Sequence, residues 1–371
     1  MSIKAFDYLH SLAEIEDEVH TAINRVLHSN QLILGEETAE FEREFAKFVG
    51  VKHCVAVTSG TTALHLSLLA LNIGPGDEVI TVSNTCTPTI AAIRLCGATP
   101  VFIDIQDDDQ MMDTSILESA INKRTRCILP VHLWGNCVNV DNVLEIAKSN
   151  NIAVLEDCAQ ASGAYYKQNH VGTFGDAGCF SFYPTKNLGA YGDAGAIVTN
   201  DDNLANKLRK MRMYGYDTSA TSMVEGMNAR ISEIQAAILR IKLPLFPKKL
   251  QQRAHIASIY NKMIDNSLIK KPHHMDDCTP SYHQYVIQSN NRKNLEDLLK
   301  ENEIGYGIHY PMPVHLMPAY AFLGGSKLHL PNTLKSCSDI LSLPIHDALS
   351  DDDATFVATT INMFNNQDFS N

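Results

Sequence analysis

Apolar positions in the first two-thirds of the chain follow two alternating patterns. Short runs rich in β-branched residues predict buried strands, and stretches with apolar residues three or four positions apart predict helices between them. The expected strands lie at 53–59, 74–82 (after an opening turn), 99–105, 125–133, 151–157 and 195–201. The expected helices lie at 60–72, 87–97 and 140–150. Apolar strands joined by helices are typical of an α/β fold with a mostly parallel central sheet.

The pattern changes after residues 243–250. Beyond this point we expect a helix at 250–264, a strand at 282–289, a helix at 292–303 and a stretch rich in Pro and His at 307–320. Strands and helices no longer alternate regularly here. We therefore expect two domains, a large α/β domain over 1–245 and a smaller C-terminal α+β domain over 246–371.

The composition of the chain indicates which classes of partner it can bind and in which cellular compartment it is found. The 371 residues carry a formal net charge of -12, whereas nucleic acids and anionic membranes require a basic face. The nine cysteines are scattered and form no CxxC pair, which is typical of free thiols in a reducing compartment. The first twenty residues are acidic where a signal peptide would be apolar. We expect a cytoplasmic protein without nucleic-acid or membrane partners.

Two segments offer residues that bind metals elsewhere. The run "DIQDDDQMMD" at 104–113 follows an expected strand, and a solvated loop is the expected structure. The segment "KPHHMDDC" at 271–278 combines His, Asp and Cys, but no helix or strand period places them on one face. We therefore expect no metal site.

The segment "SGTTALHL" lies at a strand-to-helix junction. Unpaired N–H groups at the start of a helix attract anions, and Gly60 lets the backbone approach a ligand closely. Ser59, Gly60 and Thr61 thus form a candidate phosphate site. An ordinary Ser or Thr N-cap is the alternative.

Two carboxylates end an apolar strand in "NIAVLEDCAQASGA", which carries Glu156 and Asp157. Open α/β sheets bind ligands at this edge, and a buried carboxylate requires a partner. The partner is either an Arg or Lys side chain or a protonated ring nitrogen of a cofactor.

The stretch "SFYPTKNLGAYGDAGAI" at 181–197 sets Lys186 among aromatic residues and glycines, with Ser181 at its start. A free lysine has a pKa of about 10.4 and is a poor nucleophile. Burial lowers that pKa and allows an imine to form with an aldehyde cofactor. A surface ion pair between Lys186 and Asp193 is the alternative.

The three features together meet the needs of pyridoxal 5'-phosphate, which binds through an anion site, a protonated ring nitrogen and a lysine. A nicotinamide cofactor is not indicated, because no GxGxxG stands between a strand and a helix. Farther along, Asn228, Arg230 and Glu233 precede an apolar helix, where helix capping is the simplest role.

At these residues the chain resembles the DegT/DnrJ/EryC1/StrS family of pyridoxal-phosphate sugar aminotransferases. The resemblance covers nearly the whole chain and is strongest in "EDCAQASGA", "SFYPTKNLGAYGDAGAIVTND", "NARISEIQAAIL" and "GIHYPMPVHLMPAY". It implies an aspartate-aminotransferase-like fold (fold type I). It also implies that Lys186 binds the cofactor aldehyde and shuttles protons, that Asp157 faces the pyridine nitrogen, and that Gln160 lies near the 3-oxygen.

The resemblance further implies which residues hold the cofactor phosphate. Gly60, Thr61 and Ser181 match positions that bind it within one subunit, and Asn228 matches a residue that reaches it from the neighbouring subunit. A homodimer with shared active sites is therefore expected. Cys86 departs from the family pattern, because it stands where many members place an aromatic residue over the cofactor ring.

The expected reaction is transamination from L-glutamate to a nucleotide-linked keto sugar. The segments "VSNTCTPTIAAI" and "LPVHLWGNCVN" resemble the subgroup that aminates C3 of dTDP-linked 3-keto-6-deoxyhexoses. Ser162 stands where many of that subgroup have histidine, so amination at C4 of a 4-keto sugar is the alternative. A regulatory protein that binds the cofactor without catalysis is a second alternative. The expected substrate contacts are Tyr183, Arg230, His309, Tyr310 and His315.

Overall fold

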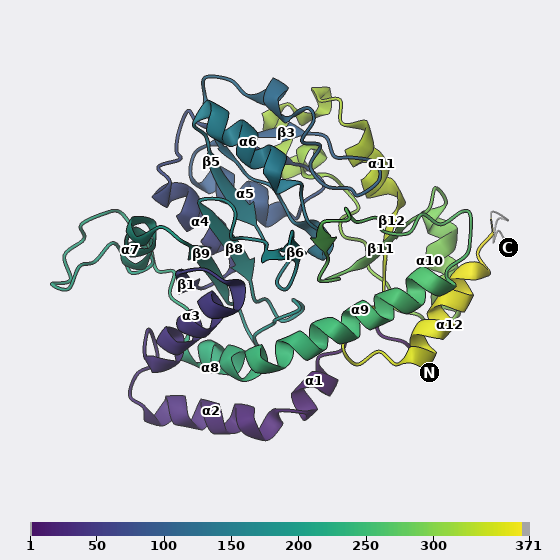
Figure 1. Cartoon of the computed structure of the whole chain (residues 1–371), viewed down its shortest axis with the longest axis horizontal. Coiled ribbons are helices and arrows are strands. Elements are labelled where there is room, and N and C mark those ends of the chain that lie inside the picture. Colours follow the sequence, from purple (N-terminus) through teal and green to yellow (C-terminus); the bar gives the residue numbers. More distant parts are fainter. Residues whose placement is uncertain (1, 366–371) are drawn as a thin grey trace.

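A seven-stranded sheet forms the centre of the computed structural model, which describes residues 2–365 (Figure 1). Its strands, in spatial order, are β1 (His53–Val57), β9 (Gly195–Thr199), β8 (Ala177–Ser181), β5 (Ala153–Asp157), β4 (Thr125–Ile128), β2 (Glu78–Val82) and β3 (Thr99–Ile103). The neighbours from β8 to β3 pair in parallel, and β9 pairs antiparallel with both β8 and β1. The expected mostly parallel sheet is confirmed.

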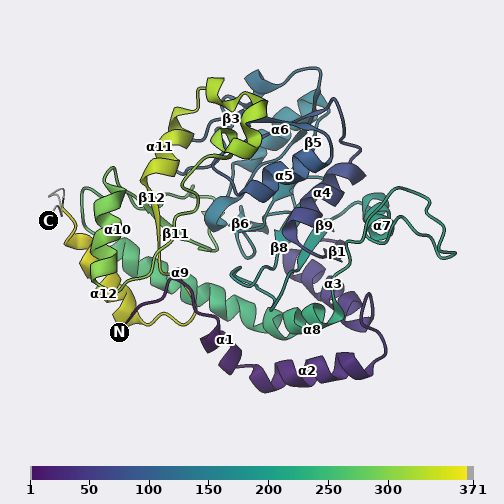
Figure 2. The same ribbon diagram turned by 180° about the vertical axis from the view of Figure 1, so that it is seen from behind.

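Helices cover the sheet on both sides. Figure 1 shows α6 in front of the sheet, and Figure 2, from behind, shows α4 and α5 in front. The helices of this part are α1 (Leu9–Ala13), α2 (Glu16–His28), α3 (Glu36–Val49), α4 (Gly60–Ala70), α5 (Thr87–Leu95), α6 (Val140–Asn150), α7 (Asp202–Met211) and α8 (Glu233–Lys242). The expected helices at 60–72, 87–97 and 140–150 are thus confirmed, the first two ending two residues early.

Two regions extend beyond the sheet and the helices that cover it: the N-terminal helix α2 and the segment between α7 and α8. The long α2 packs on α8 through Ile15, Val19 and Ile238. The segment between α7 and α8 projects from the body of the molecule (Figure 1) and exposes Tyr216 and Met223.

The C-terminal part has its own buried apolar cluster, which also includes Ile3 from the N-terminal strand-like segment. The helices and strands of the C-terminal part are α9 (Phe246–Met263), β11 (Tyr285–Gln288), α10 (Arg292–Glu301), α11 (Pro331–Asp339), β12 (Ile340–Leu343) and α12 (Asp351–Asn362). Figure 2 shows α9 running from α8 toward α10 and α12. The boundary expected between 245 and 246 coincides with the start of α9 and stays a prediction.

Short elements complete the chain. The strands β6 (Tyr165–Tyr166), β7 (Asn169–His170) and β10 (Cys278–Thr279) form a small separate sheet. The 3-10 helices are η1 (Leu117–Ala120), η2 (Leu133–Gly135), η3 (Leu243–Leu245), η4 (Val314–Leu316), η5 (Pro318–Leu323) and η6 (Gly325–Lys327). Within residues 2–365, no helix is both long and apolar enough to cross a membrane.

The acidic run at 104–113 is more ordered than the expected solvated loop. Asp104 is buried and accepts hydrogen bonds from the backbone N–H groups of Asn332 and Thr333 in the first turn of α11. Asp107 pairs with Lys270 and Lys335. Two of the aspartates therefore tie this loop to the C-terminal part. The nine cysteines are all free thiols, and Cys86 alone among them is only half-buried.

Candidate active site

A cavity of about 390 Å³ lies at the carboxyl ends of β5 and β8, beside the first turns of α4 and α5. Its walls contain six of the seven predicted cofactor residues: Gly60, Thr61, Asp157, Gln160, Ser181 and Lys186. Tyr183 and Tyr310, two of the five predicted substrate contacts, also line it. Segments more than two hundred residues apart in the chain thus meet where open α/β sheets bind ligands.

The start of α4 forms one end of this cavity. Ser59 is the N-cap, and its hydroxyl accepts a hydrogen bond from the N–H of Thr62 at 3.1 Å. The preceding amides of Gly60 and Thr61 have no partner within the helix and border the cavity. A Cβ on Gly60 would lie 2.8 Å from the Cβ of Ser181, so only glycine brings α4 this close to β8. The Ser59 N-cap is confirmed, and it leaves the Gly60 and Thr61 amides available, so the predicted anion site remains compatible with it.

Asp157 lies at the end of β5 and is 4% exposed. Its carboxylate accepts hydrogen bonds from the Thr89 hydroxyl at 2.8 Å and from the Ala159 N–H at 3.0 Å. Burial nevertheless raises the pKa of Asp157 above its usual value. A buried carboxylate of this kind has room for a cationic partner from the cavity.

Lys186 lines the same cavity. Its pKa is lowered, chiefly by burial, and the nearby Cys86 and Asp157 only partly oppose the shift. Within residues 2–365 it forms no ion pair with Asp193, so the surface-pair alternative is wrong. A buried amine with a lowered pKa is the form of lysine that attacks an aldehyde.

These three features fit pyridoxal 5'-phosphate by their chemistry. The free amides at the start of α4 suit a phosphate. The raised pKa of Asp157 shows a carboxylate that a protonated ring nitrogen would stabilise. The lowered pKa of Lys186 suits a covalent bond to an aldehyde. All three border one cavity of ligand size.

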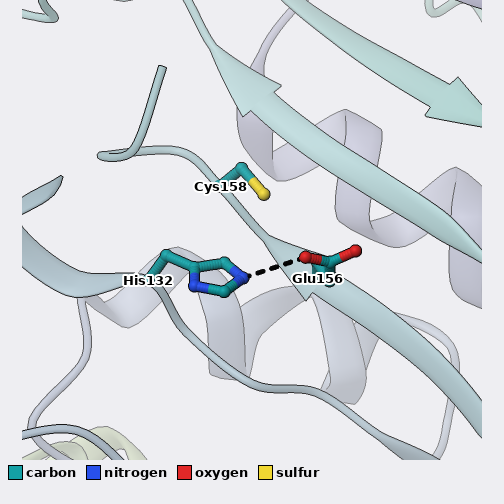
Figure 3. Close-up of side chains that lie close together, drawn as sticks. All are labelled: His132, Glu156 and Cys158. Atoms are coloured by element: carbon teal, nitrogen blue, oxygen red, sulfur yellow. Dashed lines mark hydrogen bonds and ion pairs between the residues drawn. The ribbon is translucent and has the colours of Figure 1, made fainter. Parts of the chain in front are cut away.

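The second carboxylate of β5, Glu156, has a different environment (Figure 3). Its carboxylate accepts a hydrogen bond from His132 Nε2 at 3.0 Å and from the backbone N–H groups of Gly172, Phe174 and Gly175. Burial alone would raise the pKa of Glu156, but the hydrogen bonds outweigh it and lower that pKa.

Glu156, His132 and Cys158 lie within ligand distance of one another, as in a metal site. His132 Nδ1, however, accepts a hydrogen bond from the Val138 N–H, and Nε2 donates to Glu156. No lone pair of the ring is left for a metal. The group is a buried structural network behind the cavity.

Cys86 caps α5 and lines the cavity. The hydroxyl of Tyr310 hydrogen-bonds its thiol and accepts a hydrogen bond from Gln160 Nε2 at 2.9 Å. Gln160 is fixed in turn by the Trp134 N–H, which donates to its Oε1 at 2.8 Å. Tyr310 therefore supplies an aromatic side chain to the wall in which Cys86 replaces one.

Four predicted site residues lie outside this cavity. His315 is buried, and its Nδ1 hydrogen-bonds Ser83 at 2.7 Å. His309 hydrogen-bonds Ser342 at 2.9 Å. Asn228 is exposed and accepts a hydrogen bond from Arg230 Nε at 2.9 Å.

The expected capping role of Asn228, Arg230 and Glu233 in the following helix is wrong. Ser232 is the N-cap of α8. Glu233 is buried and instead accepts hydrogen bonds from the backbone N–H groups of Gly35, Glu37 and Thr38 at the start of α3. Sequence distance hid this contact, because its partners lie almost two hundred residues away.

Sequence reasoning also missed residues that hold the site. Thr89, Trp134 and His132 orient Asp157, Gln160 and Glu156, respectively. Thr89 lies in the first turn of an expected helix that follows a strand. This position, at the edge of the sheet where ligands bind, could have indicated a site residue. Trp134 acts through its backbone N–H, for which the sequence gives no signal.

Comparison with known proteins extends these observations. The model of the DegT/DnrJ/EryC1/StrS aminotransferase family matches residues 13–362. The chain is 39% identical over 358 residues to the dTDP-3-amino-3,4,6-trideoxy-alpha-D-glucose transaminase of Micromonospora megalomicea subsp. nigra, covering 95% of this chain and 96% of the relative.

Solved structures of sugar aminotransferases have the same fold as this chain. The crystal structure of DesV from S. venezuelae has a TM-score of 0.95 at 38% identity and 98% coverage of both chains. The PLP form of the sugar aminotransferase Spr1654 from Streptococcus pneumoniae has a TM-score of 0.87 at 27% identity, covering 93% of this chain and 94% of that one. The chain therefore belongs to the DegT/DnrJ/EryC1/StrS aminotransferase family and is a pyridoxal-phosphate-dependent aminotransferase.

Proposed function

We propose that the protein transfers the amino group of L-glutamate to C3 of a dTDP-linked 3-keto-6-deoxyhexose. The observation that carries the proposal is the single cavity that joins the start of α4, Asp157 and Lys186. The similarity to a dTDP-3-amino-sugar transaminase supports position C3 and the dTDP group.

Bound pyridoxal phosphate supplies an aldehyde that accepts the amino group and a ring that takes up an electron pair from the substrate carbon. Lys186 would supply the amine that holds the aldehyde, and its free amine would remove and return the proton of the substrate carbon. Its lowered pKa keeps a larger fraction neutral and ready to accept that proton. Asp157 would hold a proton on the ring nitrogen, and Gly60, Thr61 and Ser181 would bind the phosphate.

Tyr183 and Tyr310 are proposed as substrate contacts because they line the cavity. His309 is proposed as a contact at its margin, since its pKa is lowered by burial and then by Lys186 nearby. His315 and Arg230 are proposed to act indirectly, by holding the segments that carry Tyr310 and Asn228.

We further propose a cytoplasmic homodimer. Asn228 lies outside its own cavity, beside the projecting segment whose Tyr216 and Met223 are exposed. An exposed apolar arm is what a second copy of the chain would cover, and it would bring Asn228 to the partner's phosphate site. A sedimentation experiment should show a dimer, and a monomer with full activity would contradict this part.

The position of amination is tested by the product. The enzyme is incubated with L-glutamate and either a dTDP-3-keto- or a dTDP-4-keto-6-deoxyhexose, and the amino carbon is located by NMR. Amine at C3 only supports the proposal. Amine at C4 only would assign the alternative chemistry, for which Ser162, buried and outside the cavity lining, is the sequence argument.

A further inference from the structure

A second, smaller cavity of about 30 Å³ also borders Lys186. Lys186 lines both cavities. The walls of the small one come from the N-terminal segment around Phe6 and Tyr8, the loop that follows Lys186, the end of α8 and the first half of α9. Its size admits a small polar group and excludes a sugar ring or a nucleotide.

The small cavity is rich in positive charge. Four cationic side chains line it, and they are Lys186, Lys242, Lys249 and Arg253. Only two acidic residues do, Asp7 and Asp347, and Asp7 pairs with Lys4 outside the lining. This excess of cations is notable in a chain whose net charge is -12, because unpaired buried cations are unfavourable without a ligand.

Among residues 2–365, Lys249 is the cation of the wall that forms ion pairs. Its Nζ lies 2.7 Å from Asp347 and 2.8 Å from the Ser11 hydroxyl, and the exposed Glu14 approaches it at 3.9 Å. These bonds lower the pKa of Asp347 to about 2 although burial opposes the shift. The pair is satisfied and leaves Asp347 little capacity for further cations.

Lys242, the last residue of α8, is one of three cations of the wall that have no ion-pair partner among the described residues. Within residues 2–365 its ammonium forms no ion pair; it donates to the Gly189 carbonyl and lies 4.3 Å from the centroid of the Tyr191 ring. Burial and the neighbouring Lys249 lower the pKa of Lys242 to about 8. An ammonium has three N–H donors, so donors remain for an anion.

Two further donors lie nearby: Arg253 in the cavity wall, and Tyr191, which contacts Lys242 but does not line the cavity. The Tyr191 hydroxyl is buried and lacks a hydrogen-bond partner among the described residues, and the Tyr8 ring is 6.4 Å from its ring. Arg253 is 5% exposed and bonds only the neutral carbonyl oxygens of Tyr282 and Ile345.

We propose that this small cavity binds a carboxylate group of the amino donor, with Lys242 as its principal counterion. The inference rests on the proposed function for the identity of the donor. A carboxylate fits the cavity in size, charge and need for several donors, and its position beside Lys186 leaves the donor's amino end near the large cavity. Lys242 is thereby a determinant of donor specificity, and the sugar nucleotide binds elsewhere.

The first test separates the two substrates kinetically. Lys242→Met is loaded with cofactor, and the absorbance change on adding L-glutamate is followed as a function of its concentration. The apparent affinity for L-glutamate should fall about 10-fold or more, as expected for loss of a hydrogen bond to a charged group. The apparent affinity for the keto-sugar nucleotide in the second half-reaction should stay within about 2-fold.

Matched variants control this result. Lys242→Arg should retain more affinity for L-glutamate than Lys242→Met, because the charge is kept. Lys262→Met removes an exposed lysine near the end of α9, outside the cavity lining, and should change neither affinity. Equal losses for both substrates, or a loss for the sugar nucleotide alone, would overturn the proposal; the latter would assign the cavity to the diphosphate.

The second test needs no turnover. Succinate, a dicarboxylate without an amino group, is titrated calorimetrically into the cofactor-loaded wild type and Lys242→Met. Weaker binding to the variant by about 10-fold, with no binding of the uncharged diamide of succinate, supports the site. Unchanged succinate binding in the variant contradicts it. If L-glutamate never reacts with the wild type, the proposed donor fails, while the succinate titration still decides whether the cavity binds carboxylates.

Discussion

Glu156 and Asp157 are adjacent on β5 and both buried, yet their surroundings differ completely. Glu156 does not line the cavity, and its carboxylate accepts hydrogen bonds from His132 and three backbone N–H groups. Asp157 borders the cavity with two hydrogen-bond donors. Their pKa values are shifted in opposite directions, down for Glu156 and up for Asp157.

The comparison separates structural from functional carboxylates. Both side chains are almost fully buried, so burial does not distinguish them. The number of donors does: a carboxylate with a complete set stabilises the fold, and one with an incomplete set beside a cavity is available to a ligand.

The largest expected effect is the loss of turnover in Lys186→Ala. This variant removes the cavity's amine, which nothing else in the lining replaces. Amino-sugar formation from L-glutamate, measured chromatographically, should fall to background. Near-normal activity in this variant would remove Lys186 from the chemistry.

Glu156→Ala should chiefly reduce stability. It leaves His132 and three buried backbone N–H groups without their acceptor, and removal of one member of a buried charged network costs about 3–5 kcal/mol. The free energy of unfolding is measured by urea denaturation. A loss below about 1 kcal/mol would show that the network contributes no more than a surface pair.

Asp157→Asn should leave the fold intact and impair catalysis. The amide cannot stabilise a positive charge on the ring nitrogen, and the loss of such an electrostatic partner reduces kcat by about 100-fold or more. Unfolding should need at least as much urea as in the wild type, since burial disfavours this charge without a ligand. Comparable stability losses in Asp157→Asn and Glu156→Ala would erase the contrast between them.

The smallest expected effect is a gain in stability in Lys242→Met without ligand. The pKa of Lys242 is lowered to about 8 in the folded protein, so folding works against its charge at pH 7. Removing the charge should add about 1–2 kcal/mol at pH 7 after the lost hydrogen bond is deducted.

The gain also has a predicted pH dependence. Because the unfolded chain binds this proton more tightly, wild-type stability rises from about pH 8 to the unfolded pKa, and the advantage of the variant shrinks over that range. Urea denaturation of both proteins at pH 7 and pH 9.5 measures it. A destabilised Lys242→Met would indicate a structural lysine instead of one kept for a ligand.

Local sequence signals predicted most of the sheet and brought Gly60, Asp157 and Lys186 forward as candidate site residues, whereas Gln160 and Asn228 came only from the family resemblance. β-branched runs mark the buried strands, and Asp157 and Ser181 stand at strand ends. The strand Ala177–Ser181 was not predicted, because Gly178 interrupts its apolar run and it leads directly into the lysine loop.

The contacts between side chains and segments far apart in the chain could not be predicted from the sequence. The partners of Glu233 are at the N-terminus of α3, and those of Asp104 are in α11. The small basic cavity joins the N-terminus, α8 and α9, none of which carries a recognisable motif there. Such contacts follow from packing of distant elements and not from any periodicity.

The most direct measurement is the near-ultraviolet and visible absorbance of the purified protein with pyridoxal phosphate, before and after L-glutamate is added. The wild type should show the band of the lysine-bound cofactor, and L-glutamate should convert it to the band of pyridoxamine phosphate. A keto-sugar nucleotide should then restore the first band. A wild type that gives no lysine-bound band, or one that L-glutamate leaves unchanged, would contradict the assignment of Lys186 and of the donor.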